Sequence, residues 1–154
     1  MKKIVLILIS VFFFLGLAQS AFSQSAEKIS EILEIDEISK GQAAYFICVY
    51  GNFTGETVSD NEAFDILTEK KLFDENENIS EKTSLSKACF IIAKSLNMKG
   101  GLLYSIFGSP RYALREFKAD GIVPQNSDPN QKVSGSEFIA LLSGFEKNMI
   151  NKGR

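Results

Sequence analysis

The residue types available for chemistry in this chain argue against catalysis before any fold is considered. The 154-residue sequence has no His and only two cysteines, Cys48 and Cys89, so neither thiol has an imidazole to activate it. Carboxylates are plentiful, but most fall in the first turns of expected helices or in polar loops, where they suggest no acid–base pair. We therefore expect a protein that is not an enzyme and that needs no cofactor.

The nearest approach to a metal-binding pattern is the loop that carries Asp74, Asn76 and Asn78, at positions 1, 3 and 5 of an EF-hand-like segment. Such a loop needs Gly at position 6 and a bidentate Glu at position 12. Here these positions hold Ile79 and Leu85. We expect a polar connection between helices, and no metal site.

The most suggestive binding residues are Arg111 and Arg115, which lie four residues apart on one expected helix face, with Tyr112 between them. Arg suits planar anions such as carboxylate and phosphate, and a Tyr ring can stack on a sugar. The alternative is that the two Arg side chains form structural pairs with Glu116 or Asp120. The sequence leaves both interpretations open, and we take all three residues as candidate contacts for an anionic or glycan ligand.

The first 23 residues have the pattern of a cleaved secretory signal peptide. Lys2 and Lys3 provide a positive start, Ile4–Leu17 is apolar, and small residues allow cleavage after Ser23 or after Ser20. The apolar stretch of about 14 residues is shorter than the ~20 that a membrane-spanning helix needs. We expect an exported protein of the periplasm or cell-envelope surface, with no transmembrane span after cleavage.

The mature chain of about 131 residues has the size of a single domain. Without Lys2 and Lys3 it keeps 15 Lys plus Arg against 19 Asp plus Glu, a net charge of −4. This mild acidity argues against nucleic acid as a partner. Export permits a disulfide between Cys48 and Cys89, but a buried free Cys is also an ordinary core residue, so the pairing stays open.

An internal self-match at an offset of 50 residues indicates a repeat architecture. Residues 63–90 align without a gap on residues 113–140, and a weaker third copy begins at Ser39. Five aligned positions are identical, namely Ala63 and Ala113, Asn76 and Asn126, Lys82 and Lys132, Ser84 and Ser134, and Ser86 and Ser136. Such a period predicts supersecondary units that bury their apolar faces against one another.

Capping signals predict where the helices begin and end. Helices should begin after five serines: Ser39, Ser59, Ser84, Ser109 and Ser134. Two of them, Ser59 and Ser134, have Glu three residues later and form capping boxes, and Ser109 precedes Pro110, a favoured first helical residue. Gly51, Gly100 and Gly121 are the expected ends. A lead-in helix is expected near the start of the mature chain, within residues 24–34, and a frayed polar tail over 148–154.

The layout resembles the S-layer homology repeat of bacterial envelope proteins, in which a second helix opens with an Ile/Leu-Thr-Arg-Ala-Glu motif. The matching segments are 38–43, 83–88 and 133–138. Depending on the register, the motif Arg is replaced by Gly41, Ser86 and Ser136 or by Lys40, Leu85 and Gly135. Lys40 alone keeps a positive charge, so it joins the candidate contacts, while the family's glycan-binding chemistry does not transfer as a whole.

The resemblance implies an all-α fold of helix–loop–helix repeats over residues 35–147, forming one compact helical domain with pseudo-threefold character. It also implies a non-catalytic envelope module that binds or anchors to a cell-wall or envelope glycan. The alternative is a structural or assembly protein whose repeats contact another envelope protein. An exposed apolar patch would favour this alternative, whereas a polar groove lined by Arg and Tyr would favour the glycan.

Overall fold

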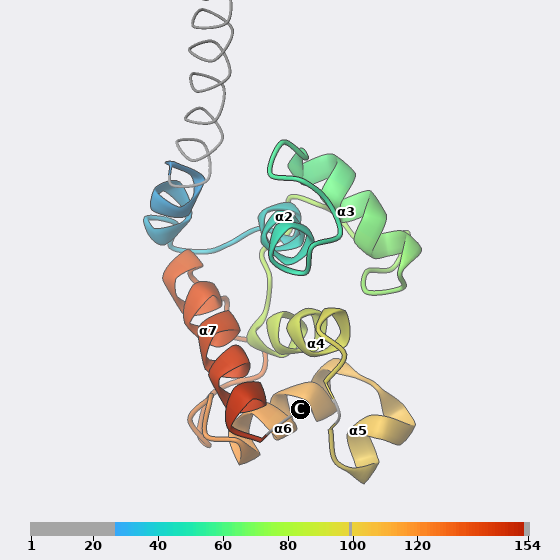
Figure 1. The fold of residues 1–154 in the computed structure, drawn as a ribbon, viewed down its shortest axis with the longest axis vertical. Coiled ribbons are helices and arrows are strands. Elements are labelled where there is room, and N and C mark those ends of the chain that lie inside the picture. Colours follow the sequence, from blue (N-terminus) through green and yellow to red (C-terminus); the bar gives the residue numbers. More distant parts are fainter. Residues whose placement is uncertain (1–26, 99, 153–154) are drawn as a thin grey trace, which may run out of the picture.

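The computed structural model describes residues 27–98 and 100–152, and its regular elements in these ranges are helices (Figure 1). A helical segment at residues 27–33 precedes the helices α2 (Lys40–Tyr50), α3 (Asp60–Glu69), α4 (Leu85–Ser95), α5 (Leu102–Phe107), α6 (Pro110–Ala119) and α7 (Gly135–Asn151). Extended pairing within the described ranges is limited to two isolated bridges, Ser39 with Lys82 and Ser84 with Lys132. The predicted all-α class is confirmed; the predicted signal peptide lies outside the described residues.

The helices α2, α3, α4, α6 and α7 begin at the predicted serines, whereas α5 follows Gly101. Ser39, Ser59, Ser84 and Ser134 each accept a hydrogen bond from the backbone amide three residues later, which satisfies one of the unpaired donors of a helix start. The two predicted capping boxes form, and Ser39 makes a third one with Gln42. Ser109 also occupies the position before its helix, but its hydroxyl makes no capping bond and Pro110 follows it.

The helix ends agree less well with the sequence. Gly121 takes the left-handed conformation after α6, with φ of 71°, as a terminating glycine should. After α4, however, the left-handed residue is Asn97 and the helix stops at Ser95, so Gly100 is not its terminator. α7 continues through Asn151 into the segment expected to fray, because half-buried Met149 packs on the core and Lys152 pairs with Asp120.

The centre of the molecule is a closed ring of backbone hydrogen bonds between the residues that precede three of the capping serines. The amide of Ile38 donates to the carbonyl of Val133 at 2.8 Å, that of Thr83 to Ile38 at 2.9 Å, and that of Val133 to Thr83 at 3.2 Å. All three side chains are fully buried. The ring therefore fixes the starts of α2, α4 and α7 relative to one another.

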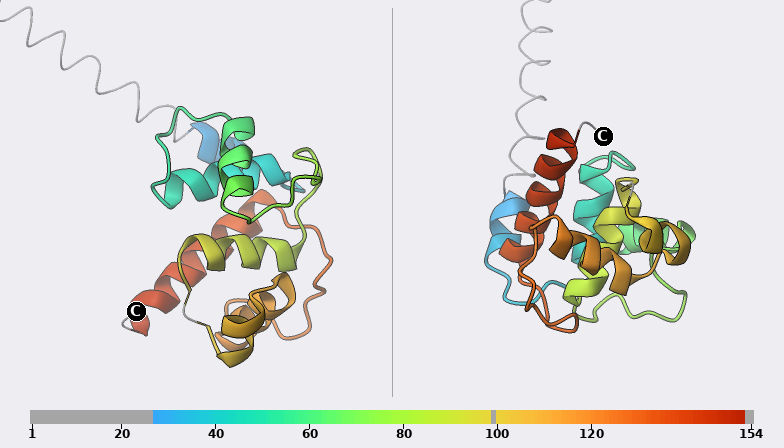
Figure 2. Two further views of the ribbon diagram at one scale, coloured as in Figure 1. Left: turned by 90° about the vertical axis from the view of Figure 1, so that its right-hand side faces the viewer. Right: turned by 90° about the horizontal axis from the view of Figure 1, so that it is seen from below.

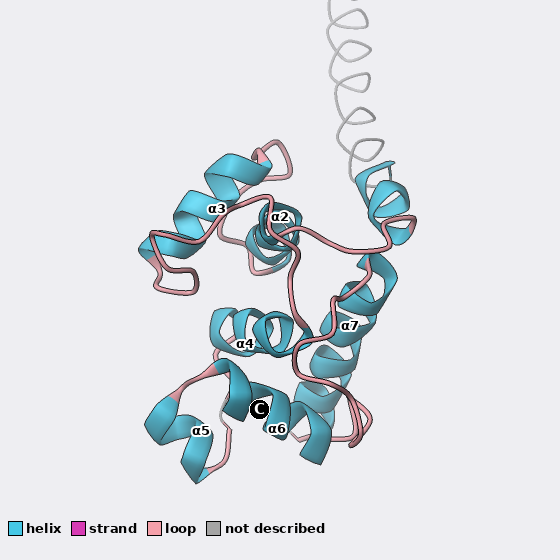
Figure 3. Ribbon diagram, turned by 180° about the vertical axis from the view of Figure 1, so that it is seen from behind, coloured by secondary structure: helices cyan, strands magenta, loops and turns pink. Residues whose placement is uncertain are grey.

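The helices pack around this centre in pairs, α2 against α3 and α4 against α6, with α5 attached to α6 (Figures 1 and 2). The segment 27–33 lies next to the start of α7, where the amide of Gly135 donates to the carbonyl of Ile35 at 2.9 Å (Figure 3). Ile32 is the residue of this segment that enters the core, whereas Ile29 and Leu33 stay exposed. Among the described residues, none of the helices has the length and apolar character needed to cross a membrane.

Candidate binding sites

An apolar groove of about 330 Å³ lies between residues 27–33, α2 and α7. We call it the groove; it is lined by Lys28, Ile29, Tyr45, Phe46, Val49, Tyr50, Glu56, Ile139, Leu142 and Ser143. Its helical residues gather there because neighbours three and four positions apart share one face of a helix. On α2 these are Tyr45, Phe46, Val49 and Tyr50, and on α7 Ile139, Leu142 and Ser143. The groove is thus an apolar face to which three helical elements contribute.

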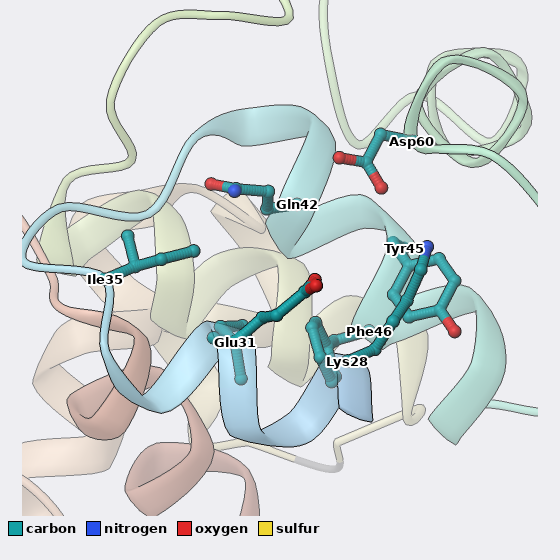
Figure 4. A pocket seen from close by; sticks show the side chains of 8 residues that line it. Lys28, Glu31, Ile35, Gln42, Tyr45, Phe46 and Asp60 are labelled. Atoms are coloured by element: carbon teal, nitrogen blue, oxygen red, sulfur yellow. The ribbon is translucent and has the colours of Figure 1, made fainter. Parts of the chain in front are cut away.

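A smaller pocket of about 80 Å³ adjoins the groove, with Lys28, Tyr45 and Phe46 common to both. Figure 4 shows the Lys28 ammonium lying against the ring of Tyr45, and the nitrogen is 3.7 Å from the ring centroid. Glu31 and Asp60 bring two carboxylates to this pocket. The charged groups beside the groove are therefore mainly acidic, and the Lys28 ammonium already lies over the ring of Tyr45.

The two tyrosines of the groove are held by polar contacts at their hydroxyl ends. Tyr45 donates to the backbone carbonyl of Glu56 at 3.1 Å, and burial, followed by the charges of Glu56 and Asp60, raises its pKa. Burial and then a hydrogen bond to Glu146 raise the pKa of Tyr50 to about 12. Both phenols are therefore neutral at physiological pH, with their rings turned to the groove as fixed apolar surface.

The predicted contacts Arg111, Tyr112 and Arg115 lie together on α6 but not in the groove. Both Arg side chains are exposed, and within the described ranges neither forms an ion pair. Tyr112 is half-buried and stacks on Phe107, with ring centroids 5.2 Å apart and an angle of 19° between the rings. The alternative interpretation, that these Arg residues pair with Glu116, Asp120 or another helix, finds no ion pair in the described ranges, and Asp120 pairs with Lys152.

Lys40 is not available as a ligand contact in this structure. Its side chain is buried and its ammonium pairs with Glu77 at 2.7 Å and with Glu81. Burial lowers its pKa, but hydrogen bonds to Glu77 and Glu81 outweigh this effect and the net pKa is raised. Glu77 also pairs with Lys87 at 2.6 Å. The cation that the family resemblance singled out thus joins α2 to the loop before α4.

Cys48 and Cys89 are both buried free thiols, so the disulfide that the sequence left open is not formed. Cys48 lies on α2 facing α3, where its Sγ donates to the carbonyl of Ala63 at 3.6 Å, whereas Cys89 belongs to α4. Burial raises the pKa of Cys48 to about 11 and also raises that of Cys89. Neutral, buried thiols are poor nucleophiles and poor metal ligands. Within the described ranges, His, Cys, Asp and Glu form no group of three or more that could hold a metal.

The spacing of Arg111 and Arg115 correctly placed them on one helix, where they remain candidate contacts, but the groove was not predicted from the sequence. The signal was present in residues 43–50, which are apolar at every position, because a helix that is apolar all round needs a cover on every side. Comparison of the chain with protein-family models, with curated proteins and with solved structures found no match.

Proposed function

We propose that this protein is an exported, non-catalytic module of the bacterial envelope that uses its helical scaffold to bind another protein. The observation that carries the proposal is the groove, an apolar surface with Ile29 and Tyr50 exposed to 45% and 42%. Protein interfaces place aromatic and aliphatic side chains at their centre and polar groups around them. The groove has this composition, with Lys28 and Glu56 among its few polar residues.

The scaffold is of the S-layer homology type in this proposal, with three units around a pseudo-threefold centre. Two features support it. The ring formed by Ile38, Thr83 and Val133 joins equivalent positions in cyclic order, and helices in the two matched segments begin 50 residues apart, α3 and α6 at Asp60 and Pro110. In this arrangement the loops and caps serve stability, and the outward faces of the helices carry the binding function.

Site-specific photo-crosslinking in the source bacterium tests the protein-binding role. A photoreactive amino acid would replace Val49 or Ile139 in the groove, with exposed Ser80 in a loop as the matched control. We expect a discrete crosslinked protein band from both groove positions and none from the control. Equal crosslinking at all three positions, or none at any of them, would contradict a protein-binding groove.

A glycan ligand is the second candidate, and the face formed by Arg111, Tyr112 and Arg115 favours it. Two exposed guanidiniums without ion-pair partners in the described ranges can bind carboxylate or phosphate groups of a wall polymer. The stacked rings of Phe107 and Tyr112 offer an adjacent surface for a sugar. This face is open, however, and lies apart from the groove, which is why we rank it second.

Sedimentation of the mature chain, residues 24–154, with purified cell-wall sacculi tests the glycan candidate. An Arg111→Ala/Arg115→Ala variant serves as the comparison, after circular dichroism has established that it folds. Sedimentation that is at least about tenfold weaker in the variant would support a glycan contact at this face. Absence of sedimentation in the parent protein would exclude these sacculi as the ligand.

A further inference from the structure

A second exposed apolar surface lies at the junction of α5 and α6. We call it the α5–α6 corner; it consists of Ile106, Phe107, Arg111, Tyr112 and Arg115. Ile106 and Phe107 are 62% and 59% exposed, and because they are adjacent in the chain they form one apolar patch, a feature that marks interaction surfaces. The short helix α5 presents them outward because Tyr104, on its other face, is buried.

The corner is a preformed projection. Phe107 rests flat on Tyr112, and the left-handed Gly108, with φ of 49°, turns the chain directly into α6 while its amide donates to the carbonyl of Tyr104 at 2.8 Å. Little side-chain freedom remains to be lost when such a stacked ring is buried against a partner. A groove of about 330 Å³ has the volume of a small pocket for a small molecule, ~300–1,000 Å³, and it therefore suits one or two large side chains better than a whole helix.

The charges of the two surfaces are complementary. Glu56 lines the groove, Glu146 bonds to Tyr50 at its edge, and Glu31 lies in the adjoining pocket. The corner instead carries Arg111 and Arg115, which form no ion pair in the described ranges, although the chain as a whole is acidic. Opposite charge around matched apolar centres steers association and fixes its orientation.

The elements that carry the two surfaces are far apart in the fold: segment 27–33 lies at one end of the ribbon and α5 at the other (Figures 1 and 3), so one copy cannot bring the surfaces together. We propose that the α5–α6 corner of one copy docks into the groove of a second copy, giving head-to-tail association. This proposal rests on the protein-binding role of the groove and names its partner. A head-to-tail contact between unlike surfaces leaves one groove and one corner free in a pair of copies, and it therefore builds open chains or larger rings and not a closed dimer.

Sedimentation velocity of the purified mature chain, residues 24–154, tests this proposal. A contact made by one aromatic projection and two guanidiniums is small, so we expect a Kd of roughly 10–100 µM. Over about 5 µM to 1 mM, the average sedimentation coefficient should rise without levelling at the dimer. Added salt should weaken the association because the flanking charges are exposed.

Charge exchange identifies the surfaces. The variant Arg111→Glu/Arg115→Glu reverses the charge of the α5–α6 corner, and Glu56→Lys/Glu146→Lys reverses the charge beside the groove. We expect each variant alone to lose at least about tenfold in affinity and an equimolar mixture of the two to recover most of it, because the reversed surfaces attract each other. The variant Lys71→Glu/Lys94→Glu makes the same change in net charge at exposed sites outside the corner, and it should associate like the parent.

Three results would overturn the inference: a monomer at every concentration, association that survives both reversals, or a mixture no better than either variant alone. If the purified protein is monomeric while the groove positions crosslink to a different protein in cells, self-docking is wrong and the proposed function stands. If the groove crosslinks to nothing and the purified chain is monomeric, both are wrong.

Discussion

The close approach between Gly135 and Ile32 allows a sharp test of how the groove is built. Gly135 is the first residue of α7, and a Cβ added to it would overlap the carbonyl oxygen of Ile32 and lie 2.7 Å from the carbonyl carbon. Those atoms are backbone, which cannot rotate away as a side-chain end can. The variant Gly135→Ala must therefore push the segment 27–33 off the start of α7, and this segment forms one wall of the groove.

The cost follows from what this movement exposes. Ile32 is 2% exposed in the structure, and losing its burial costs about 2 kcal/mol. The hydrogen bond from the amide of Gly135 to Ile35 contributes about 1 kcal/mol more. The helix preference of Ala over Gly recovers less than ~1 kcal/mol at this first position. We therefore expect a net loss of about 2–3 kcal/mol.

Urea and thermal denaturation, followed by circular dichroism, measure this loss, and Gly144→Ala is the matched control in the same helix. There the added Cβ would lie 2.9 Å from Cγ2 of the half-buried side chain of Ile122 and not against backbone, so the clash costs less than at Gly135, and an interior Ala offsets it by up to about 1 kcal/mol. Gly135→Ala should lower Tm by roughly 8–12 °C, at about 4 °C per kcal/mol. Equal Tm values for the two variants would refute the packing of residues 27–33 against α7.

Three further predictions follow from the backbone, the ion pairs and the cysteines. Lys71 has φ of 59° after α3 where Gly121 has 71° after α6, so Lys71→Gly should stabilise and Gly121→Ala destabilise the chain by about 1 kcal/mol each in urea denaturation. Glu77→Gln should cost about 1–2 kcal/mol at pH 7, since it removes one carboxylate from buried Lys40. Burial alone would raise the pKa of Glu77, but hydrogen bonds to Lys40 and neighbouring groups outweigh it, so the pKa lies below its ordinary 4.5. The Glu77 carboxylate therefore stabilises the fold fully above pH 4.5. The stability difference between parent and variant should shrink as the pH falls through the folded-state pKa. Cys48 should react with a thiol reagent such as dithiobis-nitrobenzoate only at the rate of unfolding, and fast labelling of the native protein would contradict its burial.

The sequence predicted the helix starts well because a cap is a local event. Each capping serine and its partner three residues later lie within one turn, so no knowledge of the rest of the chain is needed. Helix ends are less local. Gly100 was the obvious terminator of α4, yet Asn97 adopts the left-handed conformation after Leu96. Asn also tolerates that conformation, and the packing decides which residue takes it.

The ligand contacts were harder to predict because they depend on tertiary neighbours. Lys40 was singled out for its charge, but its partner Glu77 comes from a loop 37 positions later in the chain, and the pair closes only after α2 and α4 have packed on the same centre. Arg111 and Arg115 were placed correctly on one face of a helix, which their spacing fixes. Whether that face would be paired or free could not be read from the spacing.

The groove follows from a mismatch between the apolar surface of α2 and the helices available to cover it. Every residue in 43–50 is apolar, and α3 packs against one side, where Cys48 contacts Ala63. The opposite side carries Phe46, Val49 and Tyr50, and residues 27–33 and α7 reach it without closing over it. Phe46 and Val49 on this side are half-buried and still pack on the core, whereas Tyr50 is 42% exposed, so this side of α2 is only partly covered by the described residues. The protein partner that we propose would complete this cover, and Ile29→Glu, at an exposed lining residue, should weaken that partner's binding more than it weakens the fold.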